Sequence, residues 1–259
     1  MFKAIRIFIL LTILILVAGS TYLTQLRATD WDAPLWVSVY PINGDGSPNT
    51  QRYIKSLAKN NFQDIHTFLS EEAKYYKVPI NNPIRINVAP IVKDQPPQPP
   101  NSSSIFSVMF WSLNLRYWAF NNDSDTGPAA DVKIYVVYYD PRNNKKLSHS
   151  LGLEKGHIGV VHAYAGQQFT RRNNVIIAHE FLHTLGATDK YDLATGYPNY
   201  PVGFANPDNN PRFPQNRAEV MAGRIPINEN TAVFPKSLYR VVIGKTTAKE
   251  INWIPEQIR

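Results

Sequence analysis

Residues 174–192, NVIIAHEFLHTLGATDKYD, constrain the fold more than any other part of the chain. His179 and His183 are four residues apart, so a helix places both imidazoles on one face, with Cβ atoms about 5–6 Å apart. Apolar residues surround this pair and predict that the helix is buried on one side. Gly186 stands where helices commonly end in a left-handed residue, so we expect the chain to turn back there.

The polar residues of this segment have the spacing of a zinc site. Two imidazoles four residues apart can bind one Zn²⁺, and catalytic zinc sites have three protein ligands and one open position. Asp189 lies six residues after His183, beyond the expected turn, and offers an oxygen as the third ligand. Asp192 is the rival third ligand and Glu219 a more distant one. We predict that His179, His183 and Asp189 bind the metal.

The pattern H-E-x-x-H-x-x-G-x-x-D, from His179 to Asp189, resembles the extended motif of the metzincin clan of zinc endopeptidases. That motif ends in a third histidine, and the aspartate found here also occurs in the snapalysin-like metzincins. Met221, within the sequence EVMAG, is similar to the methionine turn that follows the motif in this clan. The resemblance covers residues 174–223, about a fifth of the chain.

The resemblance implies an α+β fold: a metzincin-like zincin with a mixed twisted sheet, a long backing helix, an active-site helix and a smaller C-terminal subdomain after the glycine turn. It also implies a zinc-dependent endopeptidase that cleaves a peptide or protein substrate with a metal-activated water and with Glu180 as the general base. Many members use a tyrosine two residues after the turn methionine, but this chain has Gly223 there. Tyr191 and His162 are unsupported candidates for the missing oxyanion donor. The alternative function is a non-catalytic, zinc-stabilised binding module at the cell surface.

The amino terminus has the pattern of an export signal. Lys3 and Arg6 precede residues 7–23, which are largely apolar and carry no charge. Seventeen residues are about the minimum for a membrane-spanning helix, and the cleavage site at residues 18–20 is weak. We therefore favour a signal-anchor in the membrane over a cleaved signal peptide. Both predict an extracytoplasmic protein, membrane-anchored or secreted, with residues 28–259 as the metalloprotease domain.

The remaining sequence predicts a mixture of strands and helices. Alternating apolar residues predict strands at residues 35–42, 84–92 and 132–139, and a hairpin formed by residues 147–153 and 157–165. Periodic or strongly apolar segments predict helices at residues 50–76 and 105–120. Residues 123–127 lack the distal glutamate of a calcium loop, and the proline-rich residues 197–217 predict an irregular segment. The histidines outside the motif are expected to be structural.

Composition excludes several other classes of function. The chain has no cysteine, so it has no disulfide, no thiolate metal site and no cysteine nucleophile. The net charge is +7, and the first 27 residues contribute three unopposed cations. No basic block occurs in the remainder, so nucleic acid is not an expected partner. An apolar fraction of 44% excludes a disordered chain.

Overall fold

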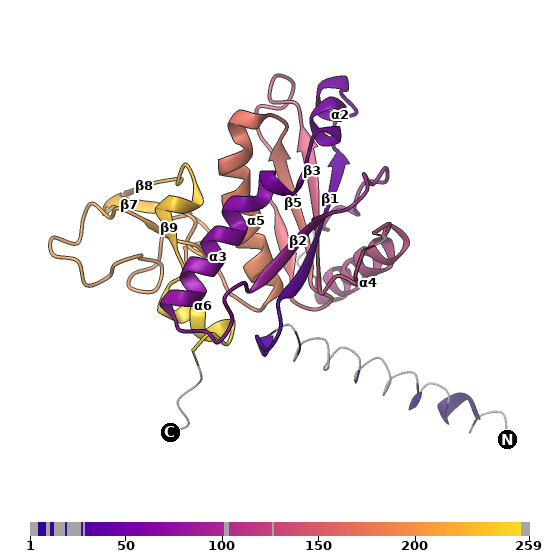
Figure 1. The fold of residues 1–259 in the computed structure, drawn as a ribbon, viewed down its shortest axis with the longest axis horizontal. Coiled ribbons are helices and arrows are strands. Elements are labelled where there is room, and N and C mark those ends of the chain that lie inside the picture. The colour runs from indigo at the N-terminus through magenta and orange to yellow at the C-terminus, as the bar shows by residue number, and fades with distance from the viewer. Residues whose placement is uncertain are drawn as a thin grey trace.

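The computed structural model describes residues 29–100, 104–125 and 127–254, together with residues 5–8, 11, 12, 19 and 27. Its largest sheet has five strands in the order β2-β1-β3-β5-β4 (Figure 1). Four of them run parallel, and β4 pairs antiparallel with β5 at one edge. The strands are β1 (Leu35–Asn43), β2 (Ile84–Val88), β3 (Val132–Tyr139), β4 (Leu151–Leu153) and β5 (Ile158–Tyr164). The predicted strands and hairpin are confirmed, although β2 and β4 are shorter than expected.

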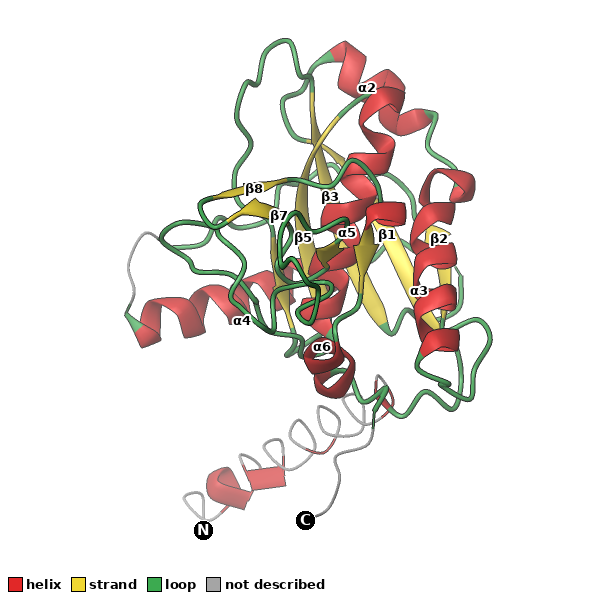
Figure 2. Ribbon diagram, turned by 90° about the vertical axis from the view of Figure 1, so that its left-hand side faces the viewer, coloured by secondary structure: helices red, strands yellow, loops and turns green. Residues whose placement is uncertain are grey.

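Helices cover both faces of this sheet (Figure 2). On one face, α3 (Gln63–Tyr75) and α5 (Thr170–Thr184) contribute to the larger hydrophobic core, and on the other α4 (Ile105–Asn121) contributes to a smaller one. Successive residues of a strand alternate between the two faces, as in β3, where Ile134 belongs to the larger core and Tyr135 to the smaller. Parallel strands require crossover connections, and α3 and α4 lie in those from β1 to β2 and from β2 to β3. The result is a mixed α/β architecture compatible with the expected α+β class.

The predicted continuous helix at residues 50–76 is wrong. The structure has three successive elements here: α2 (Pro48–Lys55), the 3-10 helix η1 (Lys59–Phe62) and α3. The hydroxyl of Ser56 donates to Tyr53 O at 2.7 Å, and Asn61 Oδ1 accepts from Ala58 N at 2.9 Å. Serine and asparagine side chains that bond to nearby backbone groups compete with helical hydrogen bonds, so the helix breaks between α2 and η1. The expected long backing helix is therefore reduced to α3.

The chain after Gly186 contains only short elements. Residues 197–217 form no helix and only isolated bridges, which confirms the predicted irregular segment. The side chain of Trp31 packs edge-on against Trp253 and donates to Ile251 O at 2.7 Å, so the two ends of the described body meet. The elements of this part are β6 (Ala218–Glu219), β7 (Ile225–Asn228), β8 (Thr231–Val233), η3 (Leu238–Arg240), β9 (Val241–Val242) and α6 (Lys245–Glu250).

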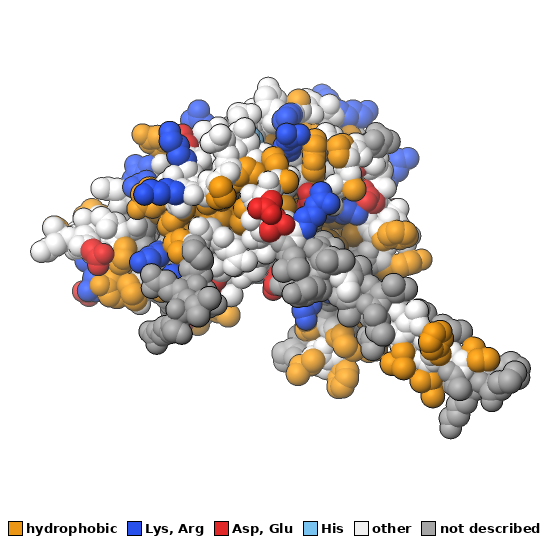
Figure 3. Space-filling view, turned by 60° about the horizontal axis from the view of Figure 1, so that its bottom comes forward, with side chains coloured by type: hydrophobic (Ala, Val, Ile, Leu, Met, Phe, Trp, Pro, Cys, Tyr) orange, Lys and Arg blue, Asp and Glu red, His pale blue; other side chains and the backbone are white. Residues whose placement is uncertain are grey.

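Helix α4 confirms the helix predicted at residues 105–120, but it is unusually exposed. Of its 17 residues, only Leu115 and Ala119 are fully buried. Eight large apolar side chains of the helix are exposed, from Ile105 at its start to Phe120 near its end. Hydrophobic side chains also gather at several places on the face shown in Figure 3. The sheet therefore holds α4 through a narrow contact.

The predicted transmembrane signal-anchor is contradicted. Among the residues that the structure describes, no helix is both long enough and apolar enough to cross a membrane. Most of residues 7–23, on which the prediction rests, lie outside the described residues. The described Ile7, Phe8 and Leu11 are helical, and their side chains are exposed. The spanning helix is thus a failed prediction, whereas export from the cytoplasm stays a prediction.

Candidate metal centre

A pair of glycines lets α5 lie close to the sheet edge. Gly152 of β4 and Gly159 of β5 are paired in the antiparallel ladder. A Cβ on Gly152 would lie 2.6 Å from His183 Cβ and closer still to Glu180 O. A Cβ on Gly159 would lie 2.7 Å from Ile134 Cδ1. Because side chains cannot occupy these spaces, the glycines allow β4 to run directly along the turn of α5 that carries the H-E-x-x-H residues.

Backbone carbonyl groups orient both imidazoles. The Nδ1 of His179 is 2.9 Å from Val220 O, and the Nδ1 of His183 is 2.7 Å from Ala187 O. A carbonyl oxygen can only accept, so each Nδ1 carries a hydrogen, and in the neutral imidazole each Nε2 has a free lone pair. The two Nε2 atoms are 3.0 Å apart. Their lone pairs therefore converge on one point, which is the usual arrangement of metal-binding histidines.

Asp189 completes a three-sided cluster with these nitrogens. Its Oδ1 lies 3.3 Å from His179 Nε2 and 3.1 Å from His183 Nε2. Gly186 has φ +96°, so the predicted left-handed turn is present between the helix and the carboxylate. Three donors at 2.0–2.1 Å from one tetrahedral ion would lie about 3.3 Å apart, which fits these distances. Within the described residues, this is the group of three histidine or acidic side chains placed to hold a metal ion.

The electrostatics of the cluster favour a cation. Burial alone would lower the pKa of His179, but the hydrogen bond with Asp189 and the charge of Glu180 raise that pKa to about 9. Burial opposes ionisation of Asp189, yet hydrogen bonds with His179 and His183 lower its pKa well below the usual value. The site thus stabilises positive charge between the three side chains, and a metal ion there would replace a proton.

Glu180 lies beside the cluster with a free carboxylate oxygen. Its side chain is buried, and Oε2 has no hydrogen-bond partner. Burial raises the pKa of Glu180, while the neighbouring imidazoles partly offset that effect. Leaving a buried acceptor unpaired costs free energy, so such groups are uncommon unless they have a function. Glu180 is placed to accept a proton from a molecule bound at the cluster.

The two rival third ligands have other partners. Asp192 Oδ1 accepts three hydrogen bonds within its own turn, from Ala194 and Thr195. Glu219 is completely buried and also accepts three hydrogen bonds. Its donors are Ala222 N, Gly244 N and the Thr247 hydroxyl. Neither carboxylate belongs to the cluster, so Asp189 is the acidic residue that the fold brings to the two histidines.

The turn around Met221 supports the cluster from the C-terminal part of the chain. Met221 is fully buried, and its backbone oxygen accepts from Lys190 N at 3.0 Å. Gly223 has φ +66° and closes the turn, with its N donating to Glu219 O at 3.0 Å. The turn therefore contacts the segment of the third ligand through Met221, while Val220 O orients His179.

Tyr191 is the one candidate oxyanion donor that lies near the cluster. Burial raises its pKa, and the charge of Asp189 and a hydrogen bond with that carboxylate add to the shift. The other candidate, His162, contacts Tyr139 on the α4 face of the sheet, where its Nδ1 is 3.0 Å from the phenol oxygen. The only sequence signal for Tyr191 was its position two residues after Asp189, which in an extended segment directs both side chains to the same side.

The remaining three histidines lie outside the cluster. His157 is buried, and its Nδ1 lies 2.7 Å from Thr184 O, so it satisfies a carbonyl at the C-terminal end of α5. His66 Nδ1 lies 3.5 Å from Gln63 Nε2 on α3. His149 is exposed.

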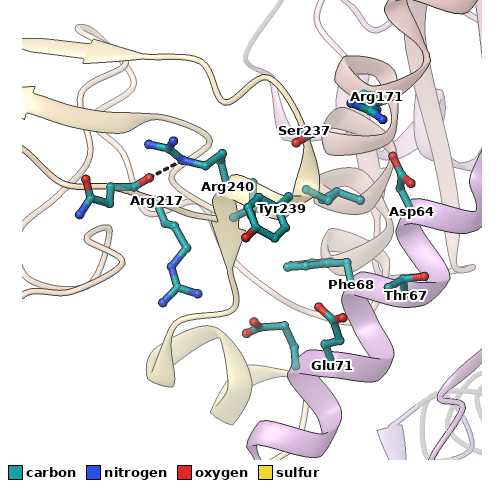
Figure 4. Close-up of a pocket in the computed structure, with 13 residues that line it drawn as sticks. Asp64, Thr67, Phe68, Glu71, Arg171, Arg217, Ser237, Tyr239 and Arg240 are labelled. Carbon is teal, nitrogen blue, oxygen red and sulfur yellow. Dashed lines mark hydrogen bonds between the residues drawn. The ribbon is translucent and has the colours of Figure 1, made fainter.

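A cavity of about 750 Å³ lies apart from the cluster, between α3, the start of α5 and residues 237–241. Figure 4 shows acidic side chains of α3 on one side and Arg217 and Arg240 on the other. Glu72, which lines the cavity, accepts from Ile243 N at 2.8 Å, and the Tyr76 hydroxyl donates to Ile243 O at 2.6 Å. Burial raises the pKa of Glu72 to about 7. The cavity lies where α3 packs against the C-terminal part of the chain.

Comparison with known proteins identifies no family for this chain. No family model matches it, and no curated protein matches it. A solved structure described as "Structure of a chaperone-substrate complex" is similar, with a TM-score of 0.38 and 14% sequence identity. The similarity covers 85% of this chain and 33% of that chain, so this chain spans about a third of its length. A TM-score this low supports no conclusion about fold or function.

Proposed function

We propose that this protein is a zinc-dependent endopeptidase of metzincin-like fold that hydrolyses peptide bonds. The observation that carries the proposal is the convergence of three donor atoms, His179 Nε2, His183 Nε2 and Asp189 Oδ1, within 3.3 Å of one another. The unpaired Glu180 carboxylate beside them supplies the group that hydrolysis requires in addition to a metal.

The three ligands would hold the ion at the end of α5. When bound, zinc polarises a scissile carbonyl and makes a water molecule more acidic. The chain's own task is to keep the ligands in place, and the carbonyl oxygens of Val220 and Ala187 do so by fixing the tautomer and orientation of both imidazoles. Asp189 adds a negative charge that compensates the cation.

Glu180 would act as the general base. Its buried Oε2 has no competing donor, so it is free to accept a proton from the attacking water. A base is most effective when its pKa lies near the working pH, and burial shifts the pKa of Glu180 upward in that direction. The same carboxyl group can then pass the proton to the leaving amine.

The edge of the sheet offers a place for an extended peptide. β4 is the last strand of the five-stranded sheet, and an extended peptide can add to such an edge through backbone hydrogen bonds. Because Gly152 brings β4 against Glu180 and His183, a peptide paired with β4 would lie beside the cluster. A peptide or protein substrate is therefore the class that this arrangement fits.

The test compares the protein with its Glu180→Gln variant in metal analysis and casein digestion. Both proteins should contain zinc, and the variant should hydrolyse casein at least a hundredfold more slowly, because general-base catalysis contributes roughly 10²–10⁴-fold. Glu229→Gln, at an exposed carboxylate, is the control and should keep full activity. Cleavage that persists in Glu180→Gln would exclude this base, and zinc without cleavage in both proteins would favour a non-catalytic binding module.

A further inference from the structure

The residues on both sides of Asp189 bind one carboxylate of the C-terminal helix. Glu250, the last residue of α6, accepts from Thr188 N at 3.1 Å and from the Thr188 hydroxyl at 2.7 Å. The same carboxylate accepts from Lys190 Nζ at 2.8 and 2.7 Å, one bond to each oxygen. One acidic side chain thus holds both sequence neighbours of a candidate metal ligand.

Lys190 makes further hydrogen bonds with the segments around Asp189. Its Nζ also donates to Thr188 O at 2.8 Å and contacts the Thr188 hydroxyl at 2.7 Å. Its backbone N donates to Met221 O at 3.0 Å, and its backbone O accepts from Asn199 N at 2.8 Å. Both the side chain and the backbone of Lys190 are therefore fixed, which leaves little freedom for Asp189 between them.

The burial of this ion pair argues for a positional role. The Lys190 side chain is 4% exposed and that of Glu250 24%. Burying two charges costs desolvation free energy that their attraction often fails to recover, so a buried pair is weak evidence for a stabilising role. Apolar residues of similar volume often stabilise a fold as well as a buried ion pair does. The pair does provide directed hydrogen bonds to the backbone next to Asp189, which apolar residues cannot provide.

We propose that Lys190 and Glu250 are positioning residues that aim the Asp189 carboxylate at His179 and His183 and thereby set the zinc affinity of the site. This inference rests on the proposed metal centre, and it goes beyond the assignment of the three ligands. Residues that orient metal ligands commonly change metal affinity by about 10–100-fold when they are replaced. The position of α6 therefore controls the third ligand, although α6 lies about 60 residues further along the chain.

The test is zinc affinity, measured on the full chain by competition with a chelating indicator. The double variant Lys190→Met/Glu250→Leu removes both charges together and leaves no unpaired ion. We expect it to unfold at or above the temperature of the metal-free parent protein, and to bind zinc at least tenfold more weakly. The absorption spectrum of the cobalt-substituted double variant should also differ from that of the parent, because the carboxylate ligand is misplaced. Glu229→Gln is the matched control and should bind zinc as the parent does.

A double-mutant cycle separates positioning from a general loss of structure. We call the Lys190–Glu250 pair the clamp. If the clamp acts through Asp189, the same double replacement should weaken zinc binding by less than twofold in an Asp189→Asn background. Equal losses in both backgrounds would overturn the proposal, as would parental zinc affinity in the double variant. Should the double variant fail to fold, Glu250→Gln replaces it, with at least a threefold loss expected and parental affinity counting against the clamp.

The same measurements test the clamp and the proposed peptidase activity separately. A parent protein that binds zinc and cleaves no peptide would refute the proposed activity, and the clamp would still be decided by zinc affinity. A parent protein that binds no zinc would overturn the clamp together with the metal centre.

Discussion

Helices α5 and α4 cover opposite faces of one sheet but meet it in different ways. Nine of the 15 residues of α5 are buried, against two of the 17 residues of α4. On the α5 face, the paired glycines 152 and 159 remove side chains from the contact. On the α4 face, bulky tyrosines project instead: Tyr135 lies 4.7 Å from the ring of Trp118, and its hydroxyl donates to Ala119 O at 3.0 Å.

The difference shows how side-chain size on a sheet sets the approach of a helix. A helix that must place ligands beside an edge strand needs a close approach, and small residues allow it. A helix held through large aromatic groups stays further out and leaves its other sides uncovered.

The largest effect should come from filling the glycine gap on the α5 face. Gly152→Val would push a side chain into His183 and the backbone of Glu180, which cannot move aside cheaply. We expect a loss of about 3 kcal/mol in the free energy of unfolding, together with weaker zinc binding. Urea unfolding and zinc competition measure both quantities. Leu153→Val, in the same strand but directed to the other core, should cost about 1 kcal/mol and leave zinc binding unchanged. Comparable zinc binding in Gly152→Val and the parent would contradict this role of the glycine.

A smaller effect is expected from the contact that holds α4. Leu115 is completely buried, so Leu115→Ala should lower the free energy of unfolding by about 2 kcal/mol, near the low end for such changes because the exposed helix can settle into the space. Leu113→Ala, on the same helix but 51% exposed, should change it by less than about 0.5 kcal/mol. Zinc binding should be the same in both variants. Equal losses of stability would mean that α4 is held by more than its narrow contact.

The smallest effect concerns a buried charge on the α5 side of the molecule. Burial raises the pKa of Glu72 from 4.5 to about 7, so between these pH values the folded state holds a proton that the unfolded state releases. The contribution of Glu72 to the free energy of unfolding is then highest below pH 4.5, falls as the pH rises to about 7, and changes no further above it. Glu72→Gln should remove this dependence and stabilise the protein by on the order of 1 kcal/mol at pH 8 relative to its effect at pH 5. Urea unfolding at both pH values measures the change, with Glu71→Gln, on the exposed side of α3, as the control for loss of a charge. A Glu72→Gln effect that is equal at pH 5 and pH 8 would exclude the linkage.

Local sequence patterns predicted much of the fold. The alternating residues of β1 and β3 were sufficient because period-two burial is a property of a single strand. The helix at residues 50–76 failed because its interruption depends on distant groups as well as local ones: Asn174 Nδ2 on α5 donates to Asn61 O at 2.8 Å. The pattern of apolar residues at 50–76 cannot predict that contact.

The candidate site also combines features that local sequence predicts with features that depend on tertiary contacts. By itself the sequence determined the spacing of His179 and His183 on one helix face and the left-handed turn at Gly186, because both follow from bonds between near neighbours in the chain. It favoured Asp189 as the third ligand, with Asp192 as the rival. Only the tertiary structure brings Asp189 to the two histidines, while it encloses Asp192 in its own turn and fixes the neighbours of Asp189 with Glu250. The contact of Val220 O with His179 and the pairing of Gly152 with Gly159 were likewise decided by the tertiary structure, since contacts between distant segments exist only after the chain has folded.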